Sequence, residues 1–542
     1  MVHDAVIDSG LHSRAGREPL VVACANRIFR WLERVSRRRT AVCLLVVLLT
    51  IGTRLMLLPR LPIPHPFVAD EFSYILGAET FASGRMTNPT HPMWVHFETL
   101  HDLMRPTYMT KYPPGQSLFL ALGLRLFGNA WFGVLISFGL FAGALCWMLQ
   151  KWVPPVYALL GTAITLARVS ILGYWMNSYW GGAVAGMAGC VVLGTIPLLA
   201  RRVKLRDAAL LALGLVILAN TRPFEGLVMS LAAGVGLVFL RARNGTLKEL
   251  LSPKIALPLV LICGSGVLLD GYYNFRVTGN ALVMPYTAYS RSYASHPPWI
   301  FAALPKFPDY RHPELANSWR NELNHFLRVR SSPSLNLTEL EEIFEFYGSA
   351  LWLFPSAVGL LLSRNRGLRV SFAIYACAWL ALAAEGVKAP HYIAGAVGLL
   401  PLMTVFGFRS IKAVSGRYGA VLTLLLASLL CVQGVTARGN EKERSWQTRP
   451  RGYVSSRMIA TSGVEKAGGR HLILVRYAAD HIDKSDDCVY NDADIDKSPI
   501  VWAHDMGEAE NREIVGYFSD RKAWLFEPDA DPKRLRPYSA PY

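Results

Sequence analysis

The chain is constrained most by a series of apolar runs long enough to cross a lipid bilayer. A hydrocarbon core of about 30 Å needs about 20 mostly apolar residues in a helix. Such runs occur at residues 41–58, 131–150, 154–172, 181–200, 207–220, 224–241, 255–272, 346–363, 369–384, 390–408 and 417–434. With 52% hydrophobic and 18% charged residues, the chain is neither disordered nor typical of a soluble enzyme. We therefore expect an all-α polytopic membrane protein with about eleven spans.

Basic residues gather in alternate loops between these runs and in the arm that precedes the first run. They are Arg27, Arg30, Arg34, Arg37, Arg38 and Arg39; Arg201, Arg202, Lys204 and Arg206; Arg241, Arg243 and Lys248; Arg364, Arg366 and Arg369; Arg409, Lys412 and Arg417. Lys and Arg are retained on the cytoplasmic side of a membrane. The pattern predicts a cytoplasmic arm at residues 1–40 and an external C-terminus. Because much of the net charge of +17 is explained by topology, no nucleic-acid partner is expected.

The expected membrane domain covers residues 41–434 and carries two long external segments, 59–115 and 273–345. The first segment ends near a short apolar stretch, 116–127, which we place at the interface, and the second ends in a helix at about 334–346. Residues 435–542 form a polar tail. Its runs HLILVRY, PIVWAHDM and AWLFEP are typical of strands, and NREIVGYF is typical of a helix. A small external α/β domain is therefore predicted at the C-terminus.

The cysteines and histidines do not predict a metal or cofactor site. Most of the 8 cysteines lie in apolar runs, and none belongs to a CxxC pair. His91, His96 and His101 follow one another at intervals of five, with Glu98 and Asp102 among them. That interval places them on neither one helix face nor one strand face. A divalent metal is therefore not indicated, and no cofactor is expected.

The acidic pair Asp70 and Glu71 opens the first external segment. A helix that begins there brings Asp70, Ser73 and Tyr74 to one face by their i, i+3 and i+4 spacing. Acidic residues are common in the first turn of a helix because they oppose its macrodipole. A carboxylate at the bilayer surface beside a cationic ligand is also suited to act as a general base. Both roles are compatible at Asp70.

Lys111 and Tyr112 precede a Pro-Pro-Gly turn and an apolar helix. Proline favours the first turn of a helix, so this turn directs a helix N-terminus toward Lys111. A lysine beside a helix N-terminus forms an anion site that suits a phosphate at headgroup depth. The alternative is a lysine that extends along apolar surface to reach water, without a specific ligand.

Three short loops on the expected external side hold further polar residues. They are MNSYWGG with Tyr179, TRPFEG with Arg222 and Glu225, and KAPHY with His391. Tyr179 is also explained by the aromatic belt of a membrane, and Arg222 and Glu225 by a mutual ion pair. Together with the first external segment, however, these polar groups converge on one membrane face, which indicates a binding site there.

These motifs resemble those of the GT-C superfamily of integral-membrane glycosyltransferases. Within it the chain is similar to the protein O-mannosyltransferases and lipid A aminoarabinose transferases, through ADEFSY after the first span, GRMTNP after it, and KYPPG before the next apolar helix. The short loops look like those of a bacterial branch of this family. The resemblance covers about residues 40–410. It implies an inner-membrane enzyme with a periplasmic active site.

The resemblance implies a sugar donor linked to a polyprenyl phosphate, attacked with inversion at the anomeric carbon. The candidate catalytic residues are Asp70 and Glu71. Asp70 matches the catalytic base of such enzymes, and Glu71 and Tyr74 are expected to orient it. Lys111 matches the lysine that contacts the donor phosphate. Tyr112 is inserted where the family often has Lys-Pro-Pro. The candidate substrate-binding residues are Tyr74, His91, Lys111, Tyr112, Tyr179, Arg222, Glu225 and His391. The acceptor, a glycan, lipid or protein, is not specified by the sequence.

Two other functions compete with a glycosyltransferase. A transporter or lipid flippase places ionisable residues near the middle of the membrane in broken helices, whereas the predicted spans are almost wholly apolar at mid-depth. A non-catalytic envelope assembly factor would not need the Asp, His, Tyr and Lys residues of the first external segment. Both remain alternatives.

Overall fold

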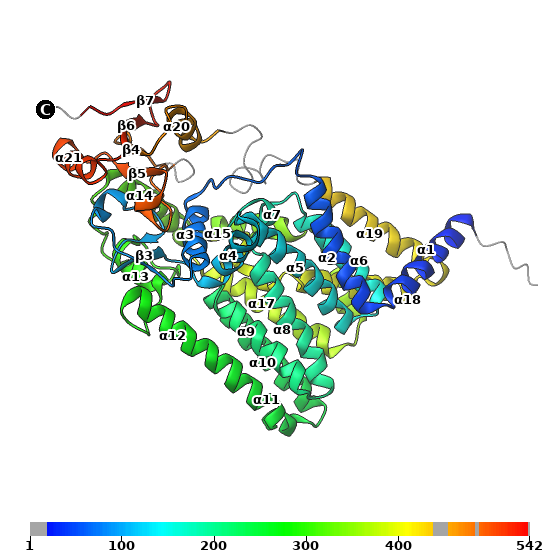
Figure 1. Cartoon of the computed structure of the whole chain (residues 1–542). Coiled ribbons are helices and arrows are strands. Elements are labelled where there is room, and N and C mark those ends of the chain that lie inside the picture. Colours follow the sequence, from blue (N-terminus) through cyan, green and yellow to red (C-terminus); the bar gives the residue numbers. More distant parts are fainter. Residues whose placement is uncertain (1–18, 437–453, 483–486, 540–542) are drawn as a thin grey trace, which may run out of the picture.

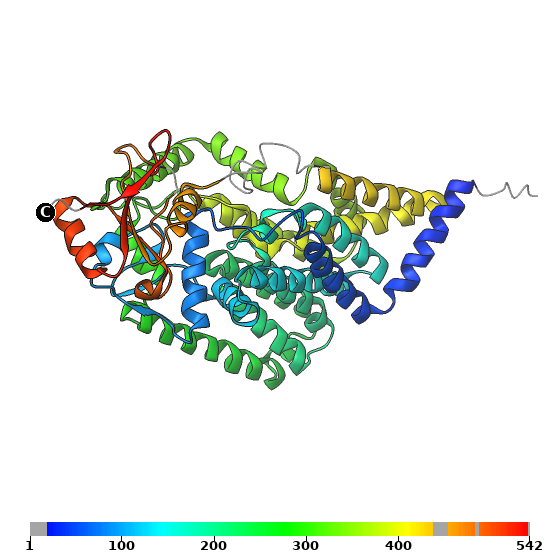
Figure 2. The ribbon, with the colours of Figure 1, turned by 45° about the horizontal axis from the view of Figure 1, so that its top comes forward.

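The computed structural model describes residues 19–436, 454–482 and 487–539 of the chain. A bundle of α-helices forms the main body, and a small sheet with its own helices lies at one end of it (Figure 1). The helix α1 (Leu20–Ser36) lies at the opposite end, as both views show (Figure 2). The expected fold class, an all-α membrane domain followed by a small α/β domain, is confirmed.

Within the described ranges, 7 helical segments are long and apolar enough to cross a membrane. Five of them are the single helices α2 (Arg39–Met56), α5 (Trp131–Trp152), α8 (Ala183–Arg201), α10 (Pro223–Arg243) and α17 (Arg366–Ala384). The sixth, Pro253–Thr278, consists of α11 (Pro253–Pro258), η3 (Leu259–Cys263) and α12 (Gly264–Thr278). The seventh, Gly416–Thr436, consists of η5 (Gly416–Tyr418) and α19 (Gly419–Thr436).

Two bent helix pairs raise the number of possible spans to 9. They are α15 (Pro333–Tyr347) with α16 (Ala350–Leu362), bent by 82°, and η4 (Pro390–Ala396) with α18 (Leu399–Val414), bent by 54°. The predicted runs 154–172 and 207–220 form the shorter helices α6 (Pro155–Val169) and α9 (Leu205–Ala219). Each predicted run therefore falls on a helix, while the count of about eleven spans remains a prediction.

Burial separates the inner helices of the bundle from the outer ones. The apolar window of α8 is 89% buried, whereas that of α2 is 22% buried and that of Pro253–Thr278 is 17% buried. A Cβ on Gly189 of α8 would lie 1.9 Å from the carbonyl oxygen of Gly395, so a glycine is required where α8 meets η4. The exposed apolar side chains of the outer helices form the surface that a bilayer would cover.

The segment 59–115 folds over one end of the bundle. It contains α3 (Ala69–Ala82), β1 (Asn88–Pro89), η1 (Trp94–Phe97), β2 (Asp102–Leu103) and β3 (Thr107–Thr110), and the strands pair antiparallel in the order β1-β3-β2. The stretch predicted at the interface forms α4 (Pro114–Phe127), which begins at a proline. The short α7 (Tyr174–Asn177) and η2 (Leu247–Leu251) connect longer helices.

The second long segment forms α13 (Pro285–Tyr293) and α14 (Pro313–Ser331) before α15. The helix predicted at 334–346 corresponds to α15. Helix α14 was not predicted, because its sequence is polar overall, although its buried residues Leu315, Ser318 and Trp319 follow helical spacing. Both α13 and α14 lie at the same end of the bundle as α3 and the C-terminal sheet (Figure 1).

The C-terminal domain contains a four-stranded sheet of order β5-β4-β6-β7. Its elements are α20 (Ser456–Glu465), β4 (His471–Val475), η8 (Ile495–Lys497), β5 (Ile500–His504), α21 (Glu508–Tyr517), β6 (Lys522–Glu527) and β7 (Arg534–Pro537). Strand β4 pairs parallel with β5 and β6, and β7 closes the edge antiparallel to β6. The three predicted strands and the predicted helix are thus present, with α20 and β7 in addition.

Candidate functional site

The start of α3 fixes the position of Asp70. Val68 is extended, with φ −106° and ψ 156°, and the helix begins at the next residue. The Glu71 carboxylate accepts hydrogen bonds from the backbone N–H groups of Phe67, at 2.7 Å, and Val68, at 3.2 Å. These bonds satisfy donors at the helix start, as a capping carboxylate does. Asp70 therefore occupies the first turn of a well-defined helix, with its side chain 25% exposed.

Asp70 is held by groups from the end of the same segment. The Tyr112 hydroxyl donates a short hydrogen bond to Asp70 Oδ1, and the Tyr112 ring stacks on Tyr74 with centroids 4.4 Å apart. Burial and the neighbouring negative charge of Asp70 keep the pKa of Tyr112 well above its ordinary value. Tyr112 therefore remains a donor, and three of the predicted site residues, Asp70, Tyr74 and Tyr112, lie together.

Lys111 reaches the second oxygen of Asp70 through His101. Lys111 Nζ lies 2.7 Å from His101 Nδ1, and His101 Nε2 lies 3.7 Å from Asp70 Oδ2. An ammonium group only donates, so His101 Nδ1 accepts, and a neutral imidazole then carries its proton on the nitrogen that faces Asp70. The Lys111 ammonium also lies over the rings of Tyr112, Tyr286 and Tyr289, at 5.0, 5.3 and 4.8 Å. Buried aromatic faces favour a cation there.

Glu71 and Tyr179 connect this segment to a short loop of the bundle. Glu71 Oε1 accepts from the backbone N–H of Tyr179 at 3.0 Å, and the Tyr179 hydroxyl donates to the carbonyl of Pro64 at 2.8 Å. Gln116 Nε2 donates to the Tyr179 carbonyl at 2.8 Å. Glu71 is only 4% exposed, so its carboxylate holds the backbone, while that of Asp70 is accessible.

Arg222 and Glu225 lie where α10 begins, next to η4. The Arg222 guanidinium lies over the Tyr392 ring at 4.7 Å. Arg222, Glu225 and Tyr392 line a small cavity with residues of α10, α17 and η4. The charges of Arg222 and Glu225 act on Tyr74, which places this pair within electrostatic range of the Asp70 cluster. The cavity thus brings a cation and a carboxylate close to the start of α3.

The two remaining predicted histidines lie in different surroundings. His391 is buried, with Nδ1 3.2 Å from the Tyr174 hydroxyl and its ring 4.8 Å from that of Trp180. His91 Nε2 lies 3.1 Å from Asp496 Oδ1, and its ring meets Tyr517 edge-on at 5.1 Å. His91 is thus placed at the boundary with the C-terminal domain and is not brought to the Asp70 cluster.

Sequence reasoning missed His101 as a partner of Asp70 and missed the tyrosines of α13. The signal for the tyrosines was present, because Tyr286, Tyr289 and Tyr293 follow helical i, i+3 and i+7 spacing in PYTAYSRSY. His101 carried no local signal. His101 has a φ of +73°. Its backbone N–H donates to the Tyr289 hydroxyl at 2.8 Å, which is a contact between distant segments of the chain.

The His and acidic residues weighed as metal ligands do not converge in the structure. His96 Nδ1 lies 3.4 Å from the His504 carbonyl, while Glu98 Oε1 accepts from the Tyr293 hydroxyl at 2.6 Å. Asp102 is buried in β2, and burial raises its pKa to about 7 although Ser73 and Lys111 favour its ionised form. The spacing of five therefore does not build a shared site.

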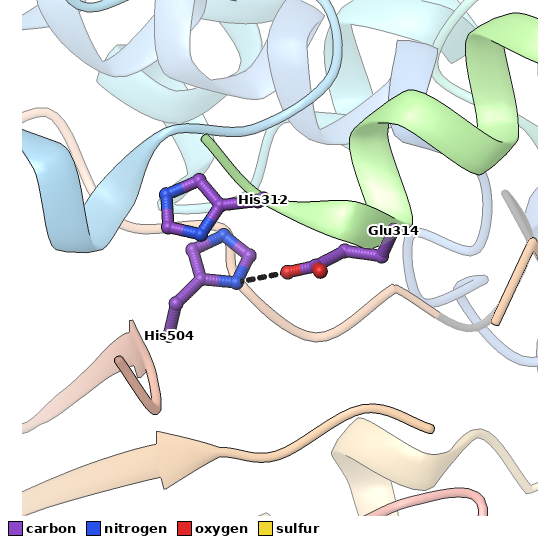
Figure 3. A group of neighbouring side chains, drawn as sticks. All are labelled: His312, Glu314 and His504. Atoms are coloured by element: carbon purple, nitrogen blue, oxygen red, sulfur yellow. Dashed lines mark ion pairs between the residues drawn. The ribbon is translucent and has the colours of Figure 1, made fainter. Parts of the chain in front are cut away.

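A different group, His312, Glu314 and His504, has its ligand atoms within 4.8 Å of one another (Figure 3). This donor set suits a divalent cation such as zinc. As the side chains lie, however, His504 Nδ1 is 2.6 Å from Glu314 Oε1, and His504 Nε2 is 2.7 Å from the Glu98 carbonyl. Burial lowers the pKa of His504, but its bond to Glu314 outweighs this and raises it. His504 and Glu314 therefore form a histidine–carboxylate contact between β5 and α14, and the His312 ring stacks on that of His504 with centroids 4.0 Å apart.

Comparisons with known proteins give similarities of fold. No family model matches the chain, and no curated protein matches it. It is similar to the crystal structure of ArnT from Cupriavidus metallidurans bound to undecaprenyl phosphate, at 13% identity and a TM-score of 0.48, covering 89% of this chain and 92% of that one. It is also similar to the oligosaccharyltransferase AglB from Archaeoglobus fulgidus in complex with an inhibitory peptide and a dolichol-phosphate, at 11% identity and a TM-score of 0.42, covering 90% of this chain and 69% of that one.

Proposed function

We propose that the chain is an inverting membrane glycosyltransferase that moves a sugar from a polyprenyl-phosphate donor to an acceptor hydroxyl or amine. The observation that carries this proposal is the Asp70 carboxylate, which is 25% exposed and held between the Tyr112 hydroxyl and the His101 imidazole. Lys111 and Arg222 supply positive charge around the same cluster. A bilayer-embedded donor suits a site at the end of an apolar bundle.

The reaction proposed here is a single displacement. The acceptor oxygen or nitrogen forms a bond to the anomeric carbon while the bond from that carbon to the phosphate oxygen breaks. The acceptor proton passes to Asp70, which is a general base, and the polyprenyl phosphate leaves with the bonding electron pair. Lys111 and Arg222 stabilise the negative charge of the departing phosphate. Attack opposite the leaving group inverts the anomeric centre.

The remaining candidate residues take supporting roles in this proposal. Tyr112 orients Asp70, Tyr74 backs the Tyr112 ring, and Lys111 holds His101. Glu225 lines the small cavity together with Arg222. Glu71 anchors the helix that carries Asp70, with Tyr179 as its partner. His391 supports the η4 side of the site, and His91 belongs to the domain boundary.

The site would face the periplasm of a bacterial inner membrane. This follows from the basic loops of the sequence, which predict that the long segments and the C-terminal domain are external. A polyprenyl phosphate keeps its tail in the bilayer and its head at the interface, so the donor reaches such a site from the lipid. The absence of a dinucleotide or P-loop motif agrees with a donor that carries no nucleotide.

The test is an assay of the purified protein with a panel of polyprenyl-phosphate-linked sugars and extracted envelope acceptors. Mass spectrometry measures released polyprenyl phosphate and glycosylated acceptor, and the proposal expects both in equal amounts. The same protein is reconstituted in vesicles that contain the lipid-linked sugar. If the sugar lipid crosses the vesicle membrane intact and none is cleaved, the chain is a transporter and the proposal is wrong.

A further inference from the structure

We infer that the C-terminal domain is a positioning element of the active site: residues Cys488–Ala493 hold the outer face of α3 and thereby place Asp70. This inference rests on the proposed function for its consequence in catalysis. It assigns a role to the C-terminal domain, for which the sequence predicted a fold but no role. The contacts that carry it join residues roughly 400 positions apart in the chain.

One face of α3 packs against the C-terminal domain. Phe72, Leu76 and Glu79 follow i, i+4 and i+7 spacing and so share this face. The Phe72 ring stacks on that of Tyr490, with centroids 4.5 Å apart and planes within 7°. Leu76 packs in a core cluster with Leu472 of the C-terminal sheet. The helix is therefore seated on the domain along its length, as Figure 2 also shows.

Polar contacts fix the position of α3 along the surface of the C-terminal domain. The backbone N–H of Ala493 donates to Glu79 Oε2 at 2.9 Å, at the end of α3 opposite Asp70. The Tyr108 hydroxyl, from β3, donates to the carbonyl of Asn491 at 2.8 Å. Tyr108 and Lys111 belong to one short stretch of chain. The segment Cys488–Ala493 therefore holds both α3, which carries Asp70, and the stretch that carries Lys111.

The segment Cys488–Ala493 is itself held rigidly by its own domain. Arg457 of α20 donates to the carbonyls of Cys488, at 2.5 Å, and Tyr490, at 2.8 Å. Its guanidinium lies over the Phe72 ring at 5.3 Å and over the Trp502 ring at 4.3 Å. Asn491 exchanges hydrogen bonds with the backbone of Trp502 in β5, at 2.8 and 2.9 Å. The sheet thus supports the residues that touch α3.

The opposite face of α3 packs on the membrane domain. The Ser117 hydroxyl, from α4, donates to the Tyr74 carbonyl at 2.9 Å, and a Cβ on Gly77 would lie 2.6 Å from that hydroxyl oxygen. Helix α3 therefore lies between the C-terminal domain and α4, with no room to shift toward α4. A displacement of the reacting groups by about 1 Å costs about 100-fold in rate, so losing the contact with the C-terminal domain is expected to lower kcat.

The experiment compares Tyr490→Ala with Tyr490→Phe, which keeps the stacked ring, and with Tyr538→Ala. Tyr538 is a partly buried tyrosine of the same domain; its hydroxyl accepts from Asn511, and its backbone N–H donates to the Ala523 carbonyl. Two readouts are taken on the full-length protein: hydrogen–deuterium exchange of the amides of residues 69–82, and kcat and KM for release of polyprenyl phosphate. Glu79→Ala, which removes the other contact, is the second variant in case Tyr490→Ala does not fold.

The inference expects faster exchange in α3 and a kcat lowered tenfold to a hundredfold in Tyr490→Ala or Glu79→Ala, with KM changed less than threefold. Tyr490→Phe and Tyr538→Ala keep parental exchange and kcat. Unchanged exchange in α3 overturns the inference whether or not the protein is active. Faster exchange with parental kcat also overturns it. If the parent releases no polyprenyl phosphate, the proposed function fails, while the exchange data still decide whether the domain holds α3.

Discussion

At the residue scale, the surroundings of Asp70 explain how one of two adjacent carboxylates is available for chemistry. Asp70 is a quarter exposed and accepts from Tyr112, whereas the buried Glu71 accepts from the backbone of Phe67, Val68 and Tyr179. A carboxylate that satisfies several backbone donors is committed to structure, because losing it would leave those donors unpaired. The two residues are thus adjacent in sequence and distinct in role.

The first prediction concerns Tyr112→Phe, which removes the hydroxyl that donates to Asp70. The bond holds one oxygen of the Asp70 carboxylate in place, so its removal lets the carboxylate leave that orientation. We expect kcat to fall about tenfold while KM changes less than threefold, because the phenyl ring can still stack on Tyr74. Steady-state rates of the parent and the variant measure this. A parental kcat would show that the Tyr112 hydroxyl does not position Asp70.

The second prediction concerns Glu71→Ala. The substitution removes the acceptor for three backbone N–H groups, and loss of such a cap costs about 1–2 kcal/mol. Thermal unfolding in detergent is expected to shift to lower temperature, whereas Asp70→Ala leaves it unchanged within error. Equal shifts for both variants would contradict the division of roles between the two carboxylates.

At the scale of elements, histidine–carboxylate contacts connect the ends of neighbouring strands in the C-terminal domain. His481 follows β4 and lies 3.0 Å from Asp487 and 2.9 Å from Asp529, which follows β6. Burial opposes the charged form of His481, but its bonds to the two carboxylates raise its pKa to about 9. The imidazolium therefore joins the ends of two neighbouring strands.

The third prediction follows from the sign of this shift. A histidine whose pKa is raised by folding from 6.5 to about 9 stabilises the fold fully below pH 6.5 and loses that contribution as the pH rises through about 9. The domain is thus expected to unfold more readily above pH 9. His481→Gln is expected to lose about 1.5–3 kcal/mol at neutral pH and to remove this alkaline dependence. Unfolding monitored by tryptophan fluorescence at several pH values checks it, and a variant with the parental pH dependence would contradict it.

The elements show which features the sequence could predict. Apolar runs can be recognised in a sequence, long ones as helices of the bundle and short ones as buried strands, so the bundle helices and β4, β5 and β6 were predicted. Helix α14, α20 and strand β7 are polar or short and were missed. The contacts that complete the site were also beyond sequence reasoning: His101 meets Lys111 within one segment, but Tyr490 meets Phe72 across most of the chain. Nothing in a local pattern specifies which distant surfaces pack together.

At the scale of the whole molecule, α1 and the C-terminal domain lie at opposite ends of the helical bundle (Figure 2). The basic residues of the loops predict that the first end is cytoplasmic and the second external. Helix α3, which carries Asp70, packs against the C-terminal domain. The orientation of the chain in the membrane thus decides which side of the membrane the Asp70 carboxylate faces.

The fourth prediction is this orientation. Cys24 in α1 is exposed and reports on the N-terminal end, whereas Cys488 in the C-terminal domain is buried. To report on the C-terminal domain, a second protein lacks Cys24 and carries a new cysteine in place of the exposed Glu508. The parent and this variant are labelled in parallel. A membrane-impermeant maleimide applied to intact cells is expected to label the new cysteine, and Cys24 only after the membrane is opened. Labelling of Cys24 in intact cells would invert the topology and place the site in the cytoplasm.

The most direct test of the central claim is release of polyprenyl phosphate from a lipid-linked sugar by the parent, Asp70→Asn and Asp70→Ala, with donor binding measured on the same samples. If Asp70 is the base, both variants bind the donor with near-parental affinity and lose about 10²–10⁴-fold in kcat. Turnover by Asp70→Asn and Asp70→Ala at the parental rate would contradict the assignment of Asp70 as the catalytic base.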